Sequence, residues 1–204
     1  MEKVAENILG IYCGQNGFRL ALILPSGTLE KEEHGKTSDL LSLRVLELLE
    51  KSGVTAHEIS KIVVGIGPGS FTSSRVAVSF VKGICSGNKS IKIVPFTTFE
   101  YFSFGKKCNV VLVPAFSDFV FVENGNEQKC IEFKDSFAGN IVADSETFAR
   151  WGKGKQIPPN KDFVKFIMEK SKEKSILVEN LRPVYLRASQ AELAREEKKN
   201  GHKA

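Results

Sequence analysis

Residues 65–72, with the sequence Gly-Ile-Gly-Pro-Gly-Ser-Phe-Thr, are the part of this chain whose composition is most typical of a binding loop. Glycines permit positive φ angles and close backbone approach, and the free N–H groups at the start of a helix favour anions. The stretch lacks the Gly-Lys-Ser/Thr of a Walker loop and the spacing of a dinucleotide-binding loop, and Pro68 removes one N–H donor. The residues alone therefore leave two interpretations open, a phosphate-binding loop and a tight turn between a strand and a helix.

Groups that would perform catalysis are sparse. The three histidines His34, His57 and His202 share no metal-ligand spacing with the cysteines. Ser70 has no identifiable base partner in the sequence, so we expect it to close a turn or cap the following helix. The cysteines form no CxxC pair and are expected to be buried thiols rather than a disulfide framework; they are Cys13, Cys85, Cys108 and Cys130. We predict no metal site, no catalytic residue and no cofactor in this chain.

Composition narrows the class of protein. The chain has 204 residues, 42% of them hydrophobic and 26% charged, which suits one larger domain or two small ones and excludes a disordered or collagen-like chain. No apolar run approaches the roughly 18–20 residues that span a bilayer, and the N-terminus lacks the residue order of a signal peptide. We therefore expect a cytoplasmic protein that does not engage a membrane.

The pattern of apolar and turn-forming residues predicts the elements that position the glycine-rich stretch. Strands are expected at residues 7–13, 18–24, 28–34, 61–66 and 91–94, with helices at 37–52, 73–86 and 97–104. Thr37 or Ser38 is expected to cap the first helix and Gly53 to end it. Thr97 and Glu100 are expected to form a capping box at the start of the third helix. The second half repeats the order with strands at 110–113, 119–123, 128–133 and 141–143, helices at 145–151 and from Asn160 to about 172, and a last strand at 176–178.

Three strands followed by alternating helix and strand thus occur twice, which predicts a duplicated α/β fold of two mixed sheets with packed helices. We place an N-terminal subdomain at residues 1–105 and a C-terminal one at 106–190. Residues 191–204 are polar and of mixed charge, and we expect them to form a flexible tail.

Two helices of the first half carry more apolar residues than one buried face needs. In residues 38–51 a single stripe of apolar side chains along the helix would be enough to cover a sheet. Further leucines lie on the other sides of the same helix. The helix after the glycines also carries small residues at one-turn spacing, which permits close approach of another helix. Burying one leucine stabilises by roughly 1.5–3 kcal/mol, so we predict association through this surface. The residues expected at that interface are Leu40, Leu43, Leu46, Val76, Ala77, Phe80, Gly83 and Ile84. The alternative is that the second half of the chain covers them.

The net charge of +5 is concentrated in one stretch. Residues 150–174 contain eight basic and three acidic side chains, so they account for the whole excess. A basic surface near Trp151, including Lys153 and Lys155, is one interpretation, with a nucleic-acid backbone as its ligand. The other, which we favour, is an ordinary solvated helix whose core side carries Phe163, Phe166 and Ile167.

Two motifs give a resemblance to a known family. The glycine-rich motif is followed three residues later by Arg75, and a second motif, Pro-Val-Tyr-Leu-Arg, stands at residues 183–187. Together they resemble the signature of the bacterial TsaB (YeaZ) family, and the order of elements matches over nearly the whole chain. The positions that carry the resemblance are Gly67, Pro68, Gly69, Ser70, Phe71, Thr72 and Arg75, with Pro183, Tyr185, Leu186 and Arg187.

The resemblance implies a duplicated actin/Hsp70-like (ASKHA, RNase H-like) fold with a reduced second half. It also implies a non-catalytic role in making threonylcarbamoyladenosine in tRNAs that read codons starting with A. The implied partners are the transferase TsaD, which holds the metal, and the ATPase TsaE, which supplies ATP hydrolysis. A homodimer is implied for the isolated chain, and contact with tRNA through the complex. Pairing in the family uses the N-terminal helices, the same helices that are too apolar here.

The sequence departs from the family pattern at two positions. The first strand ends Ile11-Tyr12-Cys13 where the family typically has Ile-Asp-Thr, and an actin-like fold uses a carboxylate there near nucleotide-bound metal. Ser73 replaces a common glycine. Two alternatives stay open: a nucleotide-binding or peptidase-like enzyme of the actin-like superfamily, and a stand-alone tRNA-binding module. Titration with ATP and magnesium tests the first, and salt-dependent tRNA binding by the isolated chain tests the second.

Overall fold

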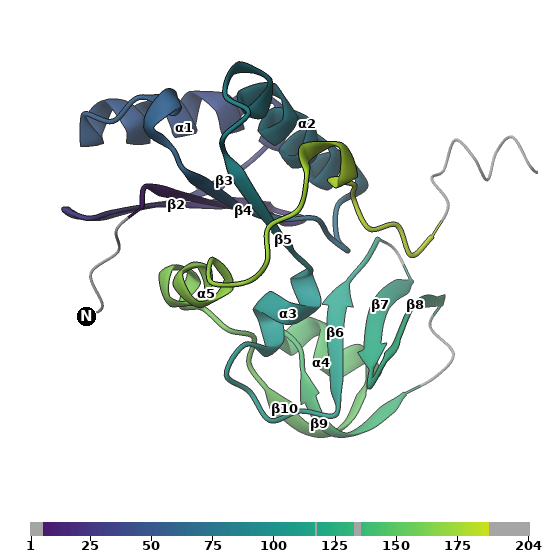
Figure 1. The fold of residues 1–204 in the computed structure, drawn as a ribbon. Coiled ribbons are helices and arrows are strands. Elements are labelled where there is room, and N and C mark those ends of the chain that lie inside the picture. The colour runs from purple at the N-terminus through teal and green to yellow at the C-terminus, as the bar shows by residue number, and fades with distance from the viewer. Residues whose placement is uncertain (1–5, 117, 133–135, 188–204) are drawn as a thin grey trace, which may run out of the picture.

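The computed structural model describes residues 6–116, 118–132 and 136–187 and shows two lobes, each built on a five-stranded mixed sheet (Figure 1). The first sheet has the order β3-β2-β1-β4-β5. Its strands are β1 (Ile8–Cys13), β2 (Gly17–Leu24), β3 (Gly27–His34), β4 (Lys61–Gly65) and β5 (Lys92–Phe96). The helices of this half are α1 (Thr37–Ser52), α2 (Phe71–Gly87) and α3 (Thr98–Ser103), with a short 3₁₀ turn at Ala56–Glu58.

The second sheet repeats the first in order and direction, as β8-β7-β6-β9-β10. Its strands are β6 (Val110–Pro114), β7 (Phe119–Asn124), β8 (Glu127–Glu132), β9 (Phe137–Val142) and β10 (Gly152–Ile157), with helices α4 (Ser145–Trp151) and α5 (Phe163–Lys170). In both sheets the first three strands pair antiparallel and the remaining two add in parallel. Only residues 133–136 join β8 to β9, so the second half has no counterpart of α1. The expected duplication with a reduced second half is confirmed.

The helices cover the sheets in layers. The first sheet packs one face against α1 and α2, and its opposite face against α3 and α5. The second sheet packs one face against α4 and the other against α3, whose Phe99 is fully buried there. Helix α3 therefore lies between the two lobes and contributes to the cores of both (Figure 1).

The chain returns to the first lobe after completing the second. Phe163, Phe166 and Ile167 of α5 pack on the first sheet, so the prediction that they form the core-facing side of a helix is confirmed. The approach is close at β1, because a Cβ on Gly10 would lie 2.7 Å from Cγ1 of Ile167. The segment then continues to Leu181, which is fully buried in the core that the first sheet forms with α1 and α2. The division at residue 105 stays a prediction, and residues 191–204 lie outside the described residues.

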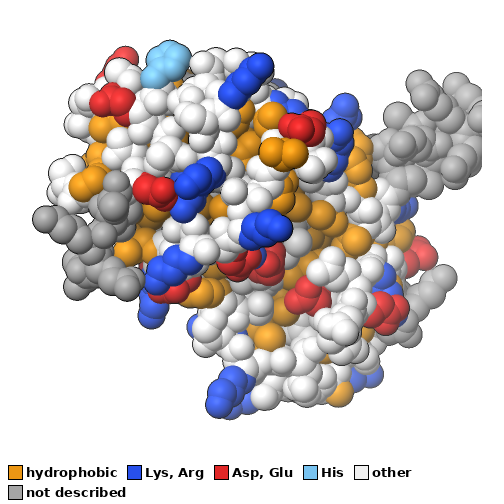
Figure 2. Space-filling model, in the orientation of Figure 1, with side chains coloured by type: hydrophobic (Ala, Val, Ile, Leu, Met, Phe, Trp, Pro, Cys, Tyr) orange, Lys and Arg blue, Asp and Glu red, His pale blue; other side chains and the backbone are white. Residues whose placement is uncertain are grey.

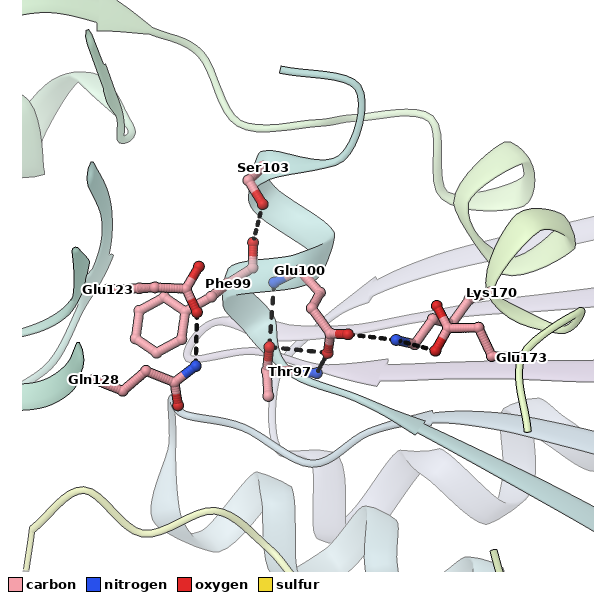
Figure 3. A network of polar contacts seen from close by, with 8 residues as sticks. All are labelled: Thr97, Phe99, Glu100, Ser103, Glu123, Gln128, Lys170 and Glu173. Carbon is pink, nitrogen blue, oxygen red and sulfur yellow. Dashed lines mark hydrogen bonds and ion pairs between the residues drawn. The ribbon is translucent and has the colours of Figure 1, made fainter. Parts of the chain in front are cut away.

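A polar network fixes α5 to α3 (Figure 3). Thr97 and Glu100 form the capping box expected from the sequence, and the second carboxylate oxygen of Glu100 accepts a hydrogen bond from Lys170. Glu173 pairs with the same ammonium group at 2.8 Å. Burial by itself would lower the pKa of Lys170, whose side chain is 8% exposed, but the two carboxylates outweigh it and raise that pKa. Lys170 therefore stays charged at neutral pH while holding the returning helix in place.

Several local predictions are wrong in instructive ways. Neither Thr37 nor Ser38 caps α1: Lys36 occupies the N-cap position without a side-chain capping hydrogen bond, and the buried Thr37 hydroxyl donates to Ser73 of α2 at 3.3 Å. Asn160 makes a turn and Asp162 caps α5. Strand β10 was not expected at all, and residues 176–178 make a single bridge, Ile93 to Ile176, instead of a strand. Gly53 follows the last residue of α1, so the expected end of this helix is confirmed.

We expect Gly10→Ala to destabilise the fold, because its methyl group would press into Ile167 across the β1–α5 contact. Overpacking of this kind typically lowers the free energy of unfolding by about 1–3 kcal/mol. Urea unfolding followed by circular dichroism measures it. Gly87→Ala is the matched control, since a Cβ there meets no atom within 4 Å. Equal stability of the two variants would contradict the close contact.

Candidate functional site

The glycine loop connects β4 to α2 and is bound tightly to α3. Gly67 has φ +100°, a value that favours glycine, and its carbonyl accepts from the Thr98 N–H at 2.8 Å. The Thr98 hydroxyl donates to the carbonyl of Pro68 at 2.6 Å. The Ser70 hydroxyl accepts from the Ser73 N–H at 3.2 Å and so caps α2, as expected. The buried part of the loop is a fixed turn, and only its end, from Gly69 onward, borders open space.

The structure brings the two sequence motifs together across more than a hundred residues. The Val184 N–H donates to the carbonyl of Ile66 at 2.8 Å, just before the glycine loop. The rings of Phe71 and Tyr185 stack with centroids 4.6 Å apart, and the Arg75 guanidinium lies 5.3 Å from the Phe71 centroid. Residues 67–75 and 183–187 thus form one continuous surface beside the start of α2.

The predicted interface residues on α1 and α2 divide into three groups. Leu43 and Leu46 are 47% and 55% exposed, and Gly83 is also open to solvent. A half-buried group both contacts the core and reaches the surface; it consists of Leu40, Val76, Phe80 and Ile84. Ala77 is a correction: it is fully buried against the first sheet and has no surface to offer a partner. The molecule's own core thus buries part of the surplus apolar surface, and Leu43 and Leu46 of α1 remain exposed.

A groove runs between α1 and α2. It has a volume of about 560 Å³ and is lined from α1 by Ser38, Leu41 and Ser42, and from α2 by Thr72, Arg75, Val76, Ser79 and Phe80. The small residues Ser79, Gly83 and Gly87 follow one another along the exposed side of α2, and a Cβ at either glycine would meet no atom within 4 Å. This side of α2 therefore permits close approach of a helix from another molecule. We call the groove together with Leu43, Leu46 and Gly83 the α1–α2 face.

Lys153 and Lys155 lie elsewhere. Both are exposed on β10, the edge strand of the second sheet, in the lobe opposite α1 and α2 (Figure 1). The basic stretch is not one solvated helix, because it divides among the end of α4, β10 and α5, and Lys170 within it is buried in an ion-pair network. Whether these lysines contact RNA stays a prediction.

A cluster of side chains lies at the end of β1, and sequence reasoning singled out only Tyr12 among them. The Tyr12 ring packs on Tyr101 and Phe96 at centroid distances of 5.0 and 6.3 Å. The Arg19 guanidinium donates to the Tyr101 hydroxyl at 2.9 Å and pairs with Glu32 at 2.7 Å. A hollow of about 270 Å³ between the lobes is lined by these side chains except Phe96, that is by Tyr12, Arg19, Glu32 and Tyr101. Since the partners come from segments far apart in sequence, only the uncommon Tyr12 gave any signal.

Burial controls the titration of two groups in this region. Burial raises the pKa of the Tyr12 hydroxyl strongly and raises the pKa of the Cys13 thiol to about 12. Neither group is therefore a ready base or nucleophile at neutral pH. Within the described part of the chain, no three His, Cys, Asp or Glu residues are grouped so as to hold a metal ion. His34 and His57 are exposed. None of the described helices has the length and apolar character to cross a bilayer.

Two comparisons with known proteins match this architecture. The sequence profile of the TsaD family, tRNA N6-adenosine threonylcarbamoyltransferase, matches residues 36–109, which run from α1 to just before β6. Two solved structures share the fold: YeaZ from Pseudomonas aeruginosa, with TM-score 0.71 and 15% identity, and an uncharacterized protein with similarity to peptidase YEAZ from the same organism, with TM-score 0.70 and 16% identity. Each match covers 89% of this chain and 100% of the other. No curated protein matches. The expected actin-like fold, and the likeness to YeaZ at the level of fold, are confirmed.

We expect Thr98→Val to loosen the glycine loop, because it leaves the carbonyl of buried Pro68 without its hydroxyl donor. A buried group left unsatisfied lowers the free energy of unfolding by about 1–3 kcal/mol. Thr72→Val, which alters an exposed hydroxyl of the same stretch, is expected to change stability by less than about 0.5 kcal/mol. Chemical denaturation of both variants measures the difference. A Thr98→Val protein as stable as the control would show that the hydrogen bond does not hold the loop.

Proposed function

We propose that this chain is the non-catalytic subunit of a tRNA-modifying assembly that makes threonylcarbamoyladenosine in tRNAs reading codons that start with A. Its direct partner is a TsaD-like transferase, and a TsaE-like ATPase joins the pair. The observation that carries the proposal is the uncovered α1–α2 face, which lies within the residues matched by the TsaD-family profile.

The α1–α2 face has the properties of a helix-docking surface. Leu43 and Leu46 project from α1, and because about half of each side chain is exposed, burying each against a partner stabilises the complex by roughly half of the 1.5–3 kcal/mol of a fully exposed leucine. The groove beside them accepts apolar side chains, and Gly83 allows a partner helix to approach closely. The same face pairs with a second copy of the chain when the transferase is absent, which gives a homodimer.

The division of labour follows from the chemistry that this chain carries. Tyr12 stands where an actin-like enzyme would use a carboxylate, and the thiol of Cys13 is held protonated by burial. These features support assigning ATP, metal and the transfer step to the partner subunits rather than to this chain. Contact with tRNA occurs through the assembled complex, with Lys153 and Lys155 on β10 as the side chains of this subunit that face it.

We expect the double substitution Leu43→Glu and Leu46→Glu to convert an oligomer of the chain to a monomer. Association would then require two carboxylates to lose their water at the contact, and this cost opposes binding. Sedimentation velocity measures the mass. The control is Leu177→Glu, which alters an equally apolar and 63% exposed side chain outside the α1–α2 face and is expected to leave the mass unchanged. An unaltered oligomer in the double variant would remove the interface from these helices.

Reconstitution tests the function itself. We expect the transferase and the ATPase together to modify tRNA substantially only when this chain is added, with threonylcarbamoyladenosine measured by mass spectrometry of digested tRNA. The Leu43→Glu, Leu46→Glu protein is expected to fail and the Leu177→Glu protein to succeed, because only the first loses the docking surface. Full activity without this chain would falsify the proposed role.

A further inference from the structure

A cavity of about 610 Å³ lies between the two lobes at the start of α2, next to the α1–α2 groove. Its walls come from the first turns of α2, the β1–β2 turn, the loop after β6 and residues 184–187. Arg75 and Arg187 are the charged side chains of its lining, which includes no Asp or Glu. Within the part of the chain that the structure describes, neither guanidinium group pairs with a carboxylate. The cavity therefore carries two positive charges that no acidic side chain of the described residues balances.

Arg187 has unused hydrogen-bonding capacity here. Its guanidinium carbon lies 3.7 Å from the centroid of Phe119 and 4.8 Å from that of Phe116, so aromatic rings hold it in place. Its Nη1 atom is buried and has no hydrogen-bond partner among residues 6–116, 118–132 and 136–187. A buried donor of this kind is unfavourable unless an acceptor reaches it, and a carboxylate is among the acceptors that a guanidinium binds best.

The rim of the cavity is aromatic. Tyr185 and Phe116 line it and are 47% and 45% exposed, so two large rings face solvent beside the two arginines. Phe71 stacks against Tyr185 and fixes its ring. On the face shown in Figure 2, hydrophobic side chains also reach the surface along the junction of the lobes, with Lys and Arg side chains beside them. Exposed rings next to guanidinium groups suit an occupant that combines an apolar side chain with carboxylates.

The chain itself continues from the wall of this cavity. Arg187 is followed by residues 188–204, which lie outside the described residues, so their sequence alone is used. Ser189 and Glu192 have the spacing of a capping box, and residues 190–199 are almost all strong helix formers. Gly201 follows as a typical helix end. The sequence therefore predicts a helix over residues 190–199.

One side of that helix matches the chemistry of the cavity. Residues three and four apart share a side of a helix, so Leu193 is flanked there by Glu196 and Glu197. The basic side chains Arg195, Lys198 and Lys199 fall on other sides. An apolar side chain between two carboxylates is the complement of exposed rings beside two guanidinium groups.

We propose that residues 190–199 dock as a helix on this cavity of their own chain, with Leu193 against the aromatic rim and the two glutamates facing the two arginines. Two linking residues suffice, because Arg187 itself lines the cavity. Since Thr72 and Arg75 line both the cavity and the α1–α2 groove, the docked helix occupies the adjoining end of that groove. This proposal replaces the flexible tail expected from composition and does not rest on the proposed function.

Hydrogen–deuterium exchange of the full chain, read by mass spectrometry, tests the proposal. A helix of about ten residues is marginal in water by itself, so we expect slow exchange at residues 190–199 only because docking stabilises them. The double substitution Glu196→Gln and Glu197→Gln should raise these exchange rates about tenfold or more, since both charge-assisted contacts are lost. Lys198→Gln with Lys199→Gln is the matched control, because it removes two charges from other sides of the helix and should change the rates far less.

The receiving surface supplies an independent variant. Arg75 is exposed, so Arg75→Gln leaves the core intact and should raise the exchange rates of residues 190–199 severalfold. Arg182→Gln should not, because Arg182 is exposed nearby and does not line the cavity.

Three outcomes would overturn the proposal. Residues 190–199 that exchange as fast as an unfolded chain would show a flexible tail. Slow exchange that neither the glutamate pair nor the Arg75 substitution changes would show a helix that forms without this cavity. Slow exchange that disappears on dilution would place the segment on a second copy of the chain instead of its own.

Discussion

The packing of the returning chain on the first sheet is the contact on which the rest of the molecule depends. Gly10 leaves room for Ile167, so α5 lies directly on β1, and Lys170 then binds Glu100 at the cap of α3. Because α3 contributes to the cores of both lobes, fixing α5 to it also fixes one lobe relative to the other. A local requirement for a small residue in one strand thus contributes to the way the two lobes are fixed to each other.

The same return builds the functional surface. After α5 the chain passes Leu181 and reaches the glycine loop, where Val184 bonds to Ile66 and Tyr185 stacks on Phe71. The segment packs closely on the glycine loop. A Cβ on Gly67 would lie only 3.3 Å from the carbonyl oxygen of Val184, so a glycine suits this contact. The polar and aromatic groups of the site consequently come from two segments that are far apart in the sequence. The α1–α2 face next to them is formed by the first half of the chain alone.

Sequence reasoning predicted what is encoded locally. Apolar periodicity located most strands and helices, and the capping box at Thr97 and Glu100 is present as expected. Strand β10 was missed because its Gly-Lys-Gly-Lys-Gln sequence lacks the branched and aromatic residues that mark strands, and pairing with β9 alone places it in the sheet. Ala77 was assigned to the surface because helical spacing gives a face but not what covers it. The contacts of Arg187 with Phe116 and Phe119 depend on tertiary packing and leave no local pattern.

The incomplete duplication has a consequence for assembly. Four residues replace an entire helix between β8 and β9, so the second lobe cannot present a two-helix surface equivalent to that of the first. Within the described residues, each chain therefore presents a single two-helix surface of this kind. In the pairing proposed above, association through this surface closes after a single event instead of propagating into a fibre, and a transferase and a second copy of the chain would compete for the same position.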